Sequence, residues 1–221
     1  MKKILFVILS ILIIGSAFIG MVTAQDQYVM KYSHVDPGDP FIGPTPAYCS
    51  TLKAEVERLS GGRIKVEIYP AGQLADQRSS CEQVRQGTIE ACNISSGVLA
   101  SLYFEKLGIV DMPFTFSSRE TARRLFDINN PFTRKLVEEC VEKTGIRILN
   151  ILPFGFRQLT NNVKPIHSPD DMKGLKIRTM EIVPHMKLME SLGATPTPIP
   201  FLELYTSLQT KVVDGRRKSI F

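Results

Sequence analysis

Two hydrophobic periodicities follow each other along the first third of the chain. Over 64–69, Ile, Val and Ile alternate with Lys, Glu and Tyr, which predicts a β-strand with one buried face. Over 45–59, apolar residues recur at helical spacing before a pair of glycines, which predicts an α-helix. Further strands are predicted at 28–34 and 89–94, with a second helix at 79–86. The order βαβαβ predicts a mostly parallel sheet covered by helices.

The middle of the chain is predicted to be mainly helical. Ser117 followed by Glu120 has the spacing of a capping box, so we expect Ser117 to cap a helix that runs towards Asn129. A second helix is predicted to begin at Pro131 and to end at Gly145. Residues 147–152 are then predicted to form another strand.

The last third begins with a turn-rich stretch, Pro153-Phe154-Gly155-Phe156, where we expect a change of domain. A capped helical turn is predicted at 168–171, and the segment GLKIRTM at 174–180 has the alternation of a strand. Helices are predicted over 182–192 and from Pro200 to about residue 210.

The first 24 residues have the pattern of a signal peptide. Lys2 and Lys3 precede an apolar run over 4–22, and small residues follow at 22–24. An uncleaved membrane anchor is the alternative, because the apolar stretch is nearly long enough to span a bilayer. Both interpretations predict export of the remainder of the chain.

Composition excludes general disorder and argues against nucleic-acid binding. Of the 221 residues, 43% are hydrophobic and 22% are charged, as in ordinary globular proteins. Loss of Lys2 and Lys3 lowers the formal net charge from +5 to +3. The only basic run is Arg216-Arg217-Lys218, and nucleic-acid binding needs a clustered basic stripe. A weakly positive cleft for an anionic ligand is compatible with this balance.

The sequence contains no pattern typical of a metal site, a cofactor or an enzyme. His34, His167 and His185 lie far apart, so we expect no metal and no cofactor. Ser95-Ser96-Gly97 lacks the flanking glycines of a nucleophile elbow. The four cysteines form no Cys-x-x-Cys motif, and they are either buried thiols or members of one or two disulfides whose pairing the sequence leaves open: Cys49, Cys81, Cys92 and Cys140.

Two arginines are candidates for an anion site. Arg178 stands near the end of a predicted strand, where it either reaches into water at the sheet rim or faces a ligand crevice. In a crevice, its guanidinium could hold a carboxylate through two parallel hydrogen bonds. Arg157 follows the predicted domain change. It is either part of the same anion site or a solvated loop arginine.

Several long stretches together resemble one family. The segments GFRQLTNNVKPIHSPDDMKGLKIRTM and LGATPTPIPFLELYTSLQTKVVDG resemble the DctP-type solute-binding proteins of TRAP (tripartite ATP-independent periplasmic) transporters. The segments VEIYPAGQLADQRSSCEQVRQGTIE and MPFTF fit the same family. The resemblance implies a two-lobed α/β periplasmic binding protein that captures organic anions, commonly carboxylates, and delivers them to membrane permease subunits. It implies a first α/β lobe at 25–153, after a signal peptide at 1–24, and the start of a second lobe at 154–221.

The resemblance also assigns roles to individual residues. Arg178 matches the carboxylate-binding arginine of the family, and Arg157 matches a second arginine that often lines the cleft. Gln77 and Ser95 fall where side chains vary with the ligand, and His34 borders the cleft at the end of the first strand.

The chain departs from the family after VVDG. The family continues with Gln-Glu-Asn-Pro, whereas this sequence reads RRKSIF, which has the look of a truncation or a frameshift. We therefore expect a fold that is incomplete at the C-terminus, an unstable chain and poor ligand binding. Besides transport, the hypotheses are a sensory module that presents the ligand to a membrane receptor, and an exported enzyme, for which no nucleophile–base pair is visible.

Overall fold

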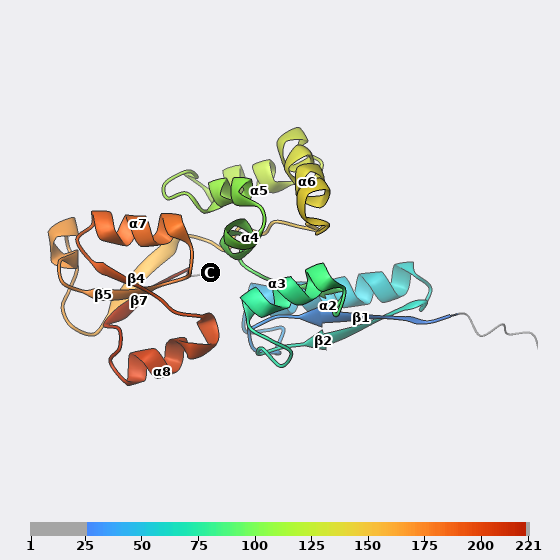
Figure 1. The fold of residues 1–221 in the computed structure, drawn as a ribbon, viewed down its shortest axis with the longest axis horizontal. Helices are drawn as coiled ribbons and strands as arrows, with labels where there is room; N and C mark the ends of the chain where they lie inside the picture. The colour runs from blue at the N-terminus through green and yellow to red at the C-terminus, as the bar shows by residue number, and fades with distance from the viewer. Residues whose placement is uncertain (1–25, 220–221) are drawn as a thin grey trace, which may run out of the picture.

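The computed structural model describes residues 26–219, in two sheets with helices around and between them (Figure 1). The predicted signal peptide at 1–24 lies outside the described residues. Among the residues it describes, no helix is both long and apolar enough to cross a membrane.

The first sheet has three parallel strands in the order β2-β1-β3. These are β1 (Tyr28–Ser33), β2 (Ile64–Tyr69) and β3 (Ala91–Cys92). Helix α2 (Pro44–Leu59) joins β1 to β2, and α3 (Gln77–Gln86) joins β2 to β3. The predicted βαβαβ order is confirmed, although β3 is much shorter than the strand expected over 89–94.

Helix α3 shows how local sequence sets the ends of an element. At its start, Oδ1 of Asp76 accepts a hydrogen bond of 2.9 Å from the backbone N–H of Ser79. At its end, Gly87 takes the left-handed conformation with φ of 73°. The helix therefore ends at Gly87, because glycine has no Cβ and adopts the left-handed conformation without a steric penalty.

Helices fill the middle of the chain, as the sequence predicts. They are α4 (Ser96–Leu102), the 3-10 helix η1 (Glu105–Asp111), α5 (Arg119–Phe126) and α6 (Pro131–Thr144). The expected cap at Ser117 is wrong by one residue. The hydroxyl of Ser118 accepts from the N–H of Thr121 at 3.1 Å, because Ser118 has the extended backbone that an N-cap requires.

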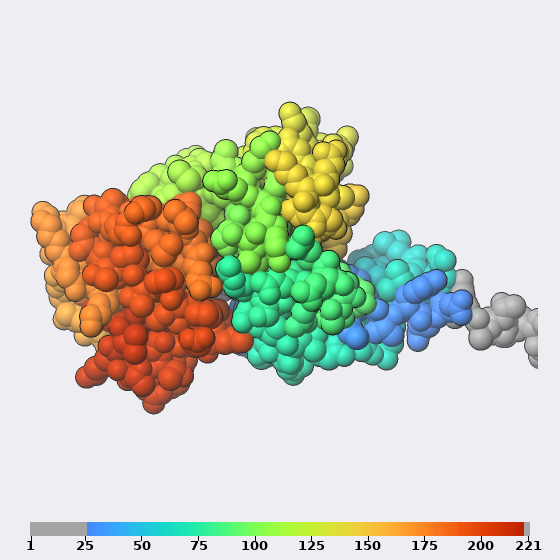
Figure 2. Space-filling model, in the orientation of Figure 1, coloured from blue at the N-terminus to red at the C-terminus, as the bar shows by residue number. Residues whose placement is uncertain are grey.

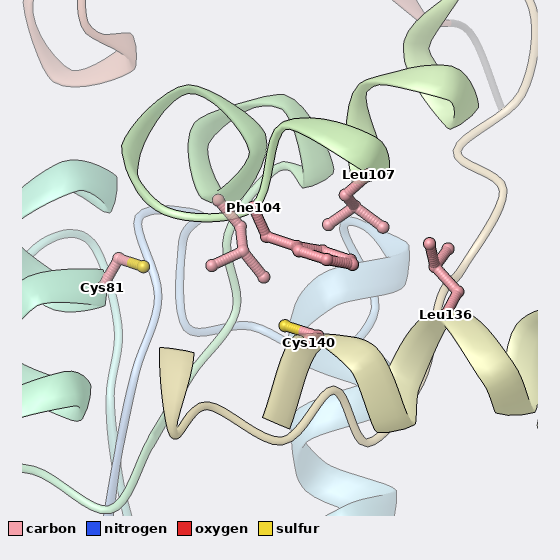
Figure 3. Packing of buried hydrophobic residues seen from close by; sticks show 6 residues of the cluster. Cys81, Phe104, Leu107, Leu136 and Cys140 are labelled. Atoms are coloured by element: carbon pink, nitrogen blue, oxygen red, sulfur yellow. The ribbon is translucent and has the colours of Figure 1, made fainter. Parts of the chain in front are cut away.

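The strand predicted at 147–152 is also absent. These residues join no ladder, although Ile148 and Ile151 pack against the buried cluster of α3, α4, η1 and α6. Figure 3 shows members of that cluster, among them Phe104, Leu107 and Leu136. The apolar residues of this segment therefore contribute to packing, but the segment has no partner strand and forms no strand itself.

The second sheet has four strands in the order β4-β7-β5-β6, with β4 antiparallel to β7 and the other pairs parallel. The strands are β4 (Arg157–Asn161), β5 (Lys176–Thr179), β6 (Thr195–Pro198) and β7 (Gly215–Ser219). Only β5 is predicted by the hydrophobic pattern. Two prolines place β6 at the edge of the sheet, where a missing N–H costs no ladder bond.

Helices cover both faces of this sheet. Helix α7 (Val183–Ser191) lies on one side, and α8 (Leu204–Gln209) lies on the other (Figure 1). The 3-10 helices η2 (Pro169–Met172) and η3 (Phe201–Glu203) precede β5 and α8. The capping box predicted at 168–171 is confirmed, since Oδ2 of Asp171 accepts from the N–H of Ser168 at 2.8 Å.

The two parts of the chain pack directly against each other, and Figure 2 shows the orange-to-red C-terminal part in contact with the green segments. Gly97 on α4 lies against Ile182, which precedes α7. A Cβ at Gly97 would come within 2.3 Å of the Ile182 Cδ1 atom. Glycine at position 97 therefore permits the close approach of α4 to the second part.

Candidate functional site

Arg178 lies buried near the end of β5. Its side chain is 6% exposed, and Nε donates a hydrogen bond of 2.9 Å to the carbonyl oxygen of Ile199. The solvent-exposed interpretation of this arginine is therefore wrong. Within residues 26–219 its two terminal nitrogens donate no hydrogen bond and form no ion pair, so the fork of the guanidinium remains available to an anion.

Three further arginines reach the same edge of the second sheet. Arg157 opens β4, which runs antiparallel to β7, while Arg216 and Arg217 lie on β7, which runs parallel to β5. The start of β4 and the ends of β5 and β7 therefore meet at one edge. There all four arginines line a single cavity.

The strand register divides the four arginines between the two faces of the sheet. Arg178 is the partner of Arg216 across the β5–β7 ladder, so both side chains leave on the same face. Arg217 is the partner of Leu159, which lies on the same face of β4 as Arg157. Arg157 and Arg217 therefore form a second pair on the opposite face.

Burial lowers the pKa of Arg157, Arg178 and Arg217, and repulsion from neighbouring arginines lowers it further for Arg178 and Arg217. The pKa of Arg178 falls to about 10, first because of burial and then because Arg157 and Arg216 are near. The pKa of Arg217 also falls to about 10, through burial and the charge of Arg157. Both stay protonated at neutral pH, so the edge carries a concentrated positive charge.

A polar contact links the two parts of the chain beside Arg157 and Arg217. The hydroxyl of Ser96 donates to Oδ2 of Asp111 at 2.6 Å, and Nε2 of His185 on α7 lies 3.6 Å from Oδ1 of Asp111. Burial and the nearby arginines lower the pKa of His185 to about 3, so the imidazole is neutral at pH 7 and the contact is not an ion pair. Burial raises the pKa of Asp111.

The cavity has a volume of about 1070 Å³ and is bounded by residues from both parts of the chain. Gln77 and Ser95 come from the first part, while Arg157 and Arg178 come from the second. A positively charged cavity with a buried guanidinium can hold a small anion, because only well-placed oxygens replace the water that the guanidinium has lost.

Comparison with known proteins agrees with this geometry. Residues 44–221 match the family model described as bacterial extracellular solute-binding protein, family 7 (DctP). The chain belongs to this family.

Individual relatives support the same assignment. A solute-binding protein of Verminephrobacter eiseniae is 35% identical over 170 residues, which are 77% of this chain and 50% of that protein. The DctP chain therefore spans about half the length of the curated relatives it matches.

Solved structures share the fold. The TRAP periplasmic solute-binding protein of Polaromonas sp. JS666, bound to D-erythronate, aligns with a TM-score of 0.79 and 33% identity, covering 87% of this chain and 61% of that one. The sugar acid binding protein of Advenella mimigardefordensis, in complex with galactonate, aligns with a TM-score of 0.80 and 29% identity, covering 87% and 60%. The predicted α/β fold of this family is confirmed.

Of the remaining predicted site residues of this DctP protein, Gln77 and Ser95 line the cavity and His34 does not. Oε1 of Gln77 accepts a hydrogen bond of 2.8 Å from the N–H of Ser95, so these two meet at the start of α4 beside the cavity. His34 is only 2% exposed and is not among the cavity-lining residues. It is therefore buried after the end of β1 and does not line the cavity.

Sequence reasoning missed four residues of this site: Asp111, His185, Arg216 and Arg217. The basic run at 216–218 is the available sequence signal for two of them, but its residues show no strand pattern that would place them beside Arg178. Asp111 and His185 have no local signal, because only packing of η1 against α7 brings them together.

No alternative chemistry gains support from the described part of the chain. Residues 26–219 contain no group of three or more His, Cys, Asp or Glu side chains that could hold a metal ion. The four cysteines are free thiols in this structure, and Cys81 and Cys140 point into the cluster of Figure 3 from different helices.

Proposed function

We propose that this protein captures an organic acid in the cavity between its two parts, and that Arg178 binds the carboxylate. The observation that carries the proposal is a buried guanidinium at the cavity edge whose terminal nitrogens have no partner within the described residues. Such a group is costly unless a ligand completes its hydrogen bonds. Membership of the DctP family and the acids named for two related structures support the same class of ligand.

The proposal includes the setting in which capture occurs. The protein acts in the periplasm after export by a signal peptide at 1–24. It has an α/β lobe at 25–153 and the start of a second lobe at 154–221. It delivers its ligand to TRAP-type permease subunits. Closure of the lobes would report occupancy to the permease. Catalysis is not part of the role, and Gln77, Ser95 and Arg157 line the ligand space beside Arg178.

A thermal-shift screen of organic acids, followed by calorimetry, tests the proposal. In contrast to the poor binding expected from the sequence alone, the arginine-lined cavity leads us to expect that at least one acid raises the thermal midpoint in a saturable manner, because a ligand that binds only the folded state stabilises it. The uncharged amide of the same acid serves as the control and is expected to have no effect. The absence of any shift across sugar acids, dicarboxylates, keto acids and aromatic acids would refute the proposed function.

A further inference from the structure

We propose that the outer edge of β2 is a pairing surface for a second copy of this chain, and that Lys53 and Glu57 of α2 keep this edge closed. Within the described residues, β2 is an edge strand of the first sheet, with β1 as its one neighbour (Figure 1). An open strand edge presents unpaired N–H and C=O groups to a strand of another chain. The inference is independent of the proposed function, since neither β2 nor these two side chains line the cavity.

The backbone of Val66, in the middle of β2, is the point where the edge is closed. Its N–H donates a hydrogen bond of 3.0 Å to Oε1 of Glu57. Its carbonyl oxygen accepts a hydrogen bond of 2.7 Å from Nζ of Lys53. Side chains of one helix therefore occupy both of the backbone groups that a further strand would need at this position.

Helical spacing places the two side chains together over the strand. Lys53 and Glu57 are four residues apart on α2, so they are neighbours on one face of the helix. Nζ of Lys53 lies 3.5 Å from Oε1 of Glu57, and we call this pair the Lys53–Glu57 clamp. Beside it, Oγ of Ser60 accepts from the N–H of Ile64 at 3.1 Å, which occupies a further backbone group of β2.

The clamp differs from an ordinary surface ion pair. The side chains of Lys53 and Glu57 are 41% and 34% exposed, and an ion pair in such a position contributes little to stability. Arg58 and Glu55 form a comparable pair at 2.6 Å, but they do so along the helix surface. What distinguishes the clamp is that it presents a donor and an acceptor to the backbone of one residue, as a pairing strand does.

The sequence of β2 is suited to pairing with itself. In an antiparallel pair centred on Val66, the two Val66 residues would exchange both backbone hydrogen bonds. Lys65 of each copy would then lie opposite Glu67 of the other, and opposite charges directly across two strands are stabilising. The arrangement is two-fold symmetric, as in most dimers. A second copy of the chain is therefore the partner that this edge fits.

Sedimentation velocity over a series of protein concentrations tests the inference. We expect Lys53→Ala/Glu57→Ala to form a reversible dimer at a concentration lower by about tenfold or more than the unmodified protein requires, because backbone hydrogen bonds become available to the second copy. Glu55→Ala/Arg58→Ala removes the neighbouring ion pair from the same helix and is the matched control. The control is expected to behave as the unmodified protein does.

Charge reversal on β2 tests the antiparallel register. When Lys65→Glu is added to the clamp variant, two carboxylates lie opposite each other at each end of the pair, and we expect the dimer to dissociate. Addition of both Lys65→Glu and Glu67→Lys restores opposite charges across the strands, and we expect the dimer to return.

Two measurements separate pairing of folded chains from association of unfolded ones. Dilution is expected to return the clamp variant to monomers, and urea unfolding of the monomer is expected to remain a single cooperative transition. A clamp variant that dimerises no more readily than the control overturns the inference. Irreversible aggregation in place of a reversible dimer, or a dimer that is indifferent to the charge reversal, overturns it as well. None of these outcomes affects the proposed function.

Discussion

Arg178 on β5 and Arg216 on β7 are register partners in a parallel ladder, and both face the cavity. Repulsion between a buried and a half-buried cation side by side opposes folding unless something else is gained. The gain proposed here is recognition of acids, and the pair thereby links the stability of the free protein to its affinity for a ligand.

Replacement of Arg178 by lysine is expected to weaken acid binding by about 1.5–3 kcal/mol, the value of a hydrogen bond to a charged group. The ammonium group is a point charge and cannot reproduce the planar fork that holds both carboxylate oxygens. Calorimetry on Arg178→Lys measures the loss, with Arg134→Lys, at an exposed position of α6 outside the cavity, as control. Retention of full affinity would remove Arg178 from the carboxylate site.

Gly97 is expected to tolerate no side chain. In Gly97→Ala the new methyl group overlaps the Ile182 side chain, which is itself buried, and we expect a loss of about 1–3 kcal/mol in the free energy of unfolding. Gly108→Ala is the control, because the nearest atom to a Cβ there is 3.8 Å away. Denaturant unfolding compares the two, and the double variant Gly97→Ala/Ile182→Ala should recover part of the loss. Equal stability of the two alanine variants would contradict the close packing.

The buried imidazole of His185 is expected to make the protein less stable as the pH falls. Its folded pKa of about 3 lies below its unfolded value of 6.5, so between these limits the unfolded chain binds a proton that the folded chain does not. Stability should therefore decrease with falling pH in this window, by up to about 1.4 kcal/mol per pH unit. The raised pKa of Asp111 acts in the opposite direction and reduces the slope at the acid end.

Urea unfolding at several pH values between 7 and 5 measures this dependence. His185→Gln keeps a polar side chain but cannot take up a proton, so its stability should change less over the same range. If the two curves ran parallel, His185 would not be the group responsible.

The cysteine thiols are expected to react slowly in the folded protein. Burial raises the pKa of Cys49 and Cys81 to about 11 and that of Cys92 to about 12, and it also raises the pKa of Cys140. Because the thiolate is the reactive form, little reaction with a thiol reagent is expected at pH 8 until the chain unfolds. Titration before and after denaturation measures this, with four thiols expected in the unfolded protein. A lower number would show disulfides, and rapid reaction of the folded protein would show an exposed thiol.

Short-range signals in the sequence determined much of the local structure. Strand β2 begins and ends where its alternation and Pro70 predict, and the glycines after α3 and α6 end those helices. The helix and strand ends depend on residues a few positions apart, whose preferences survive in most folded contexts. Arg178 and Arg157 were candidates because of their positions near a predicted strand end and domain change, and the resemblance to a known family then assigned them roles.

The sequence by itself thus predicted the α/β class, the parallel direction of the strands in the first sheet and the family. Only the tertiary structure decided that an Arg-Arg-Lys run becomes a strand of the second sheet, that His34 stays outside the cavity, and that Asp111 contacts His185. The physical reason is that β7 has no apolar alternation of its own. Ladder bonds to β4 and β5, from distant parts of the chain, make it a strand and bring its arginines to Arg178.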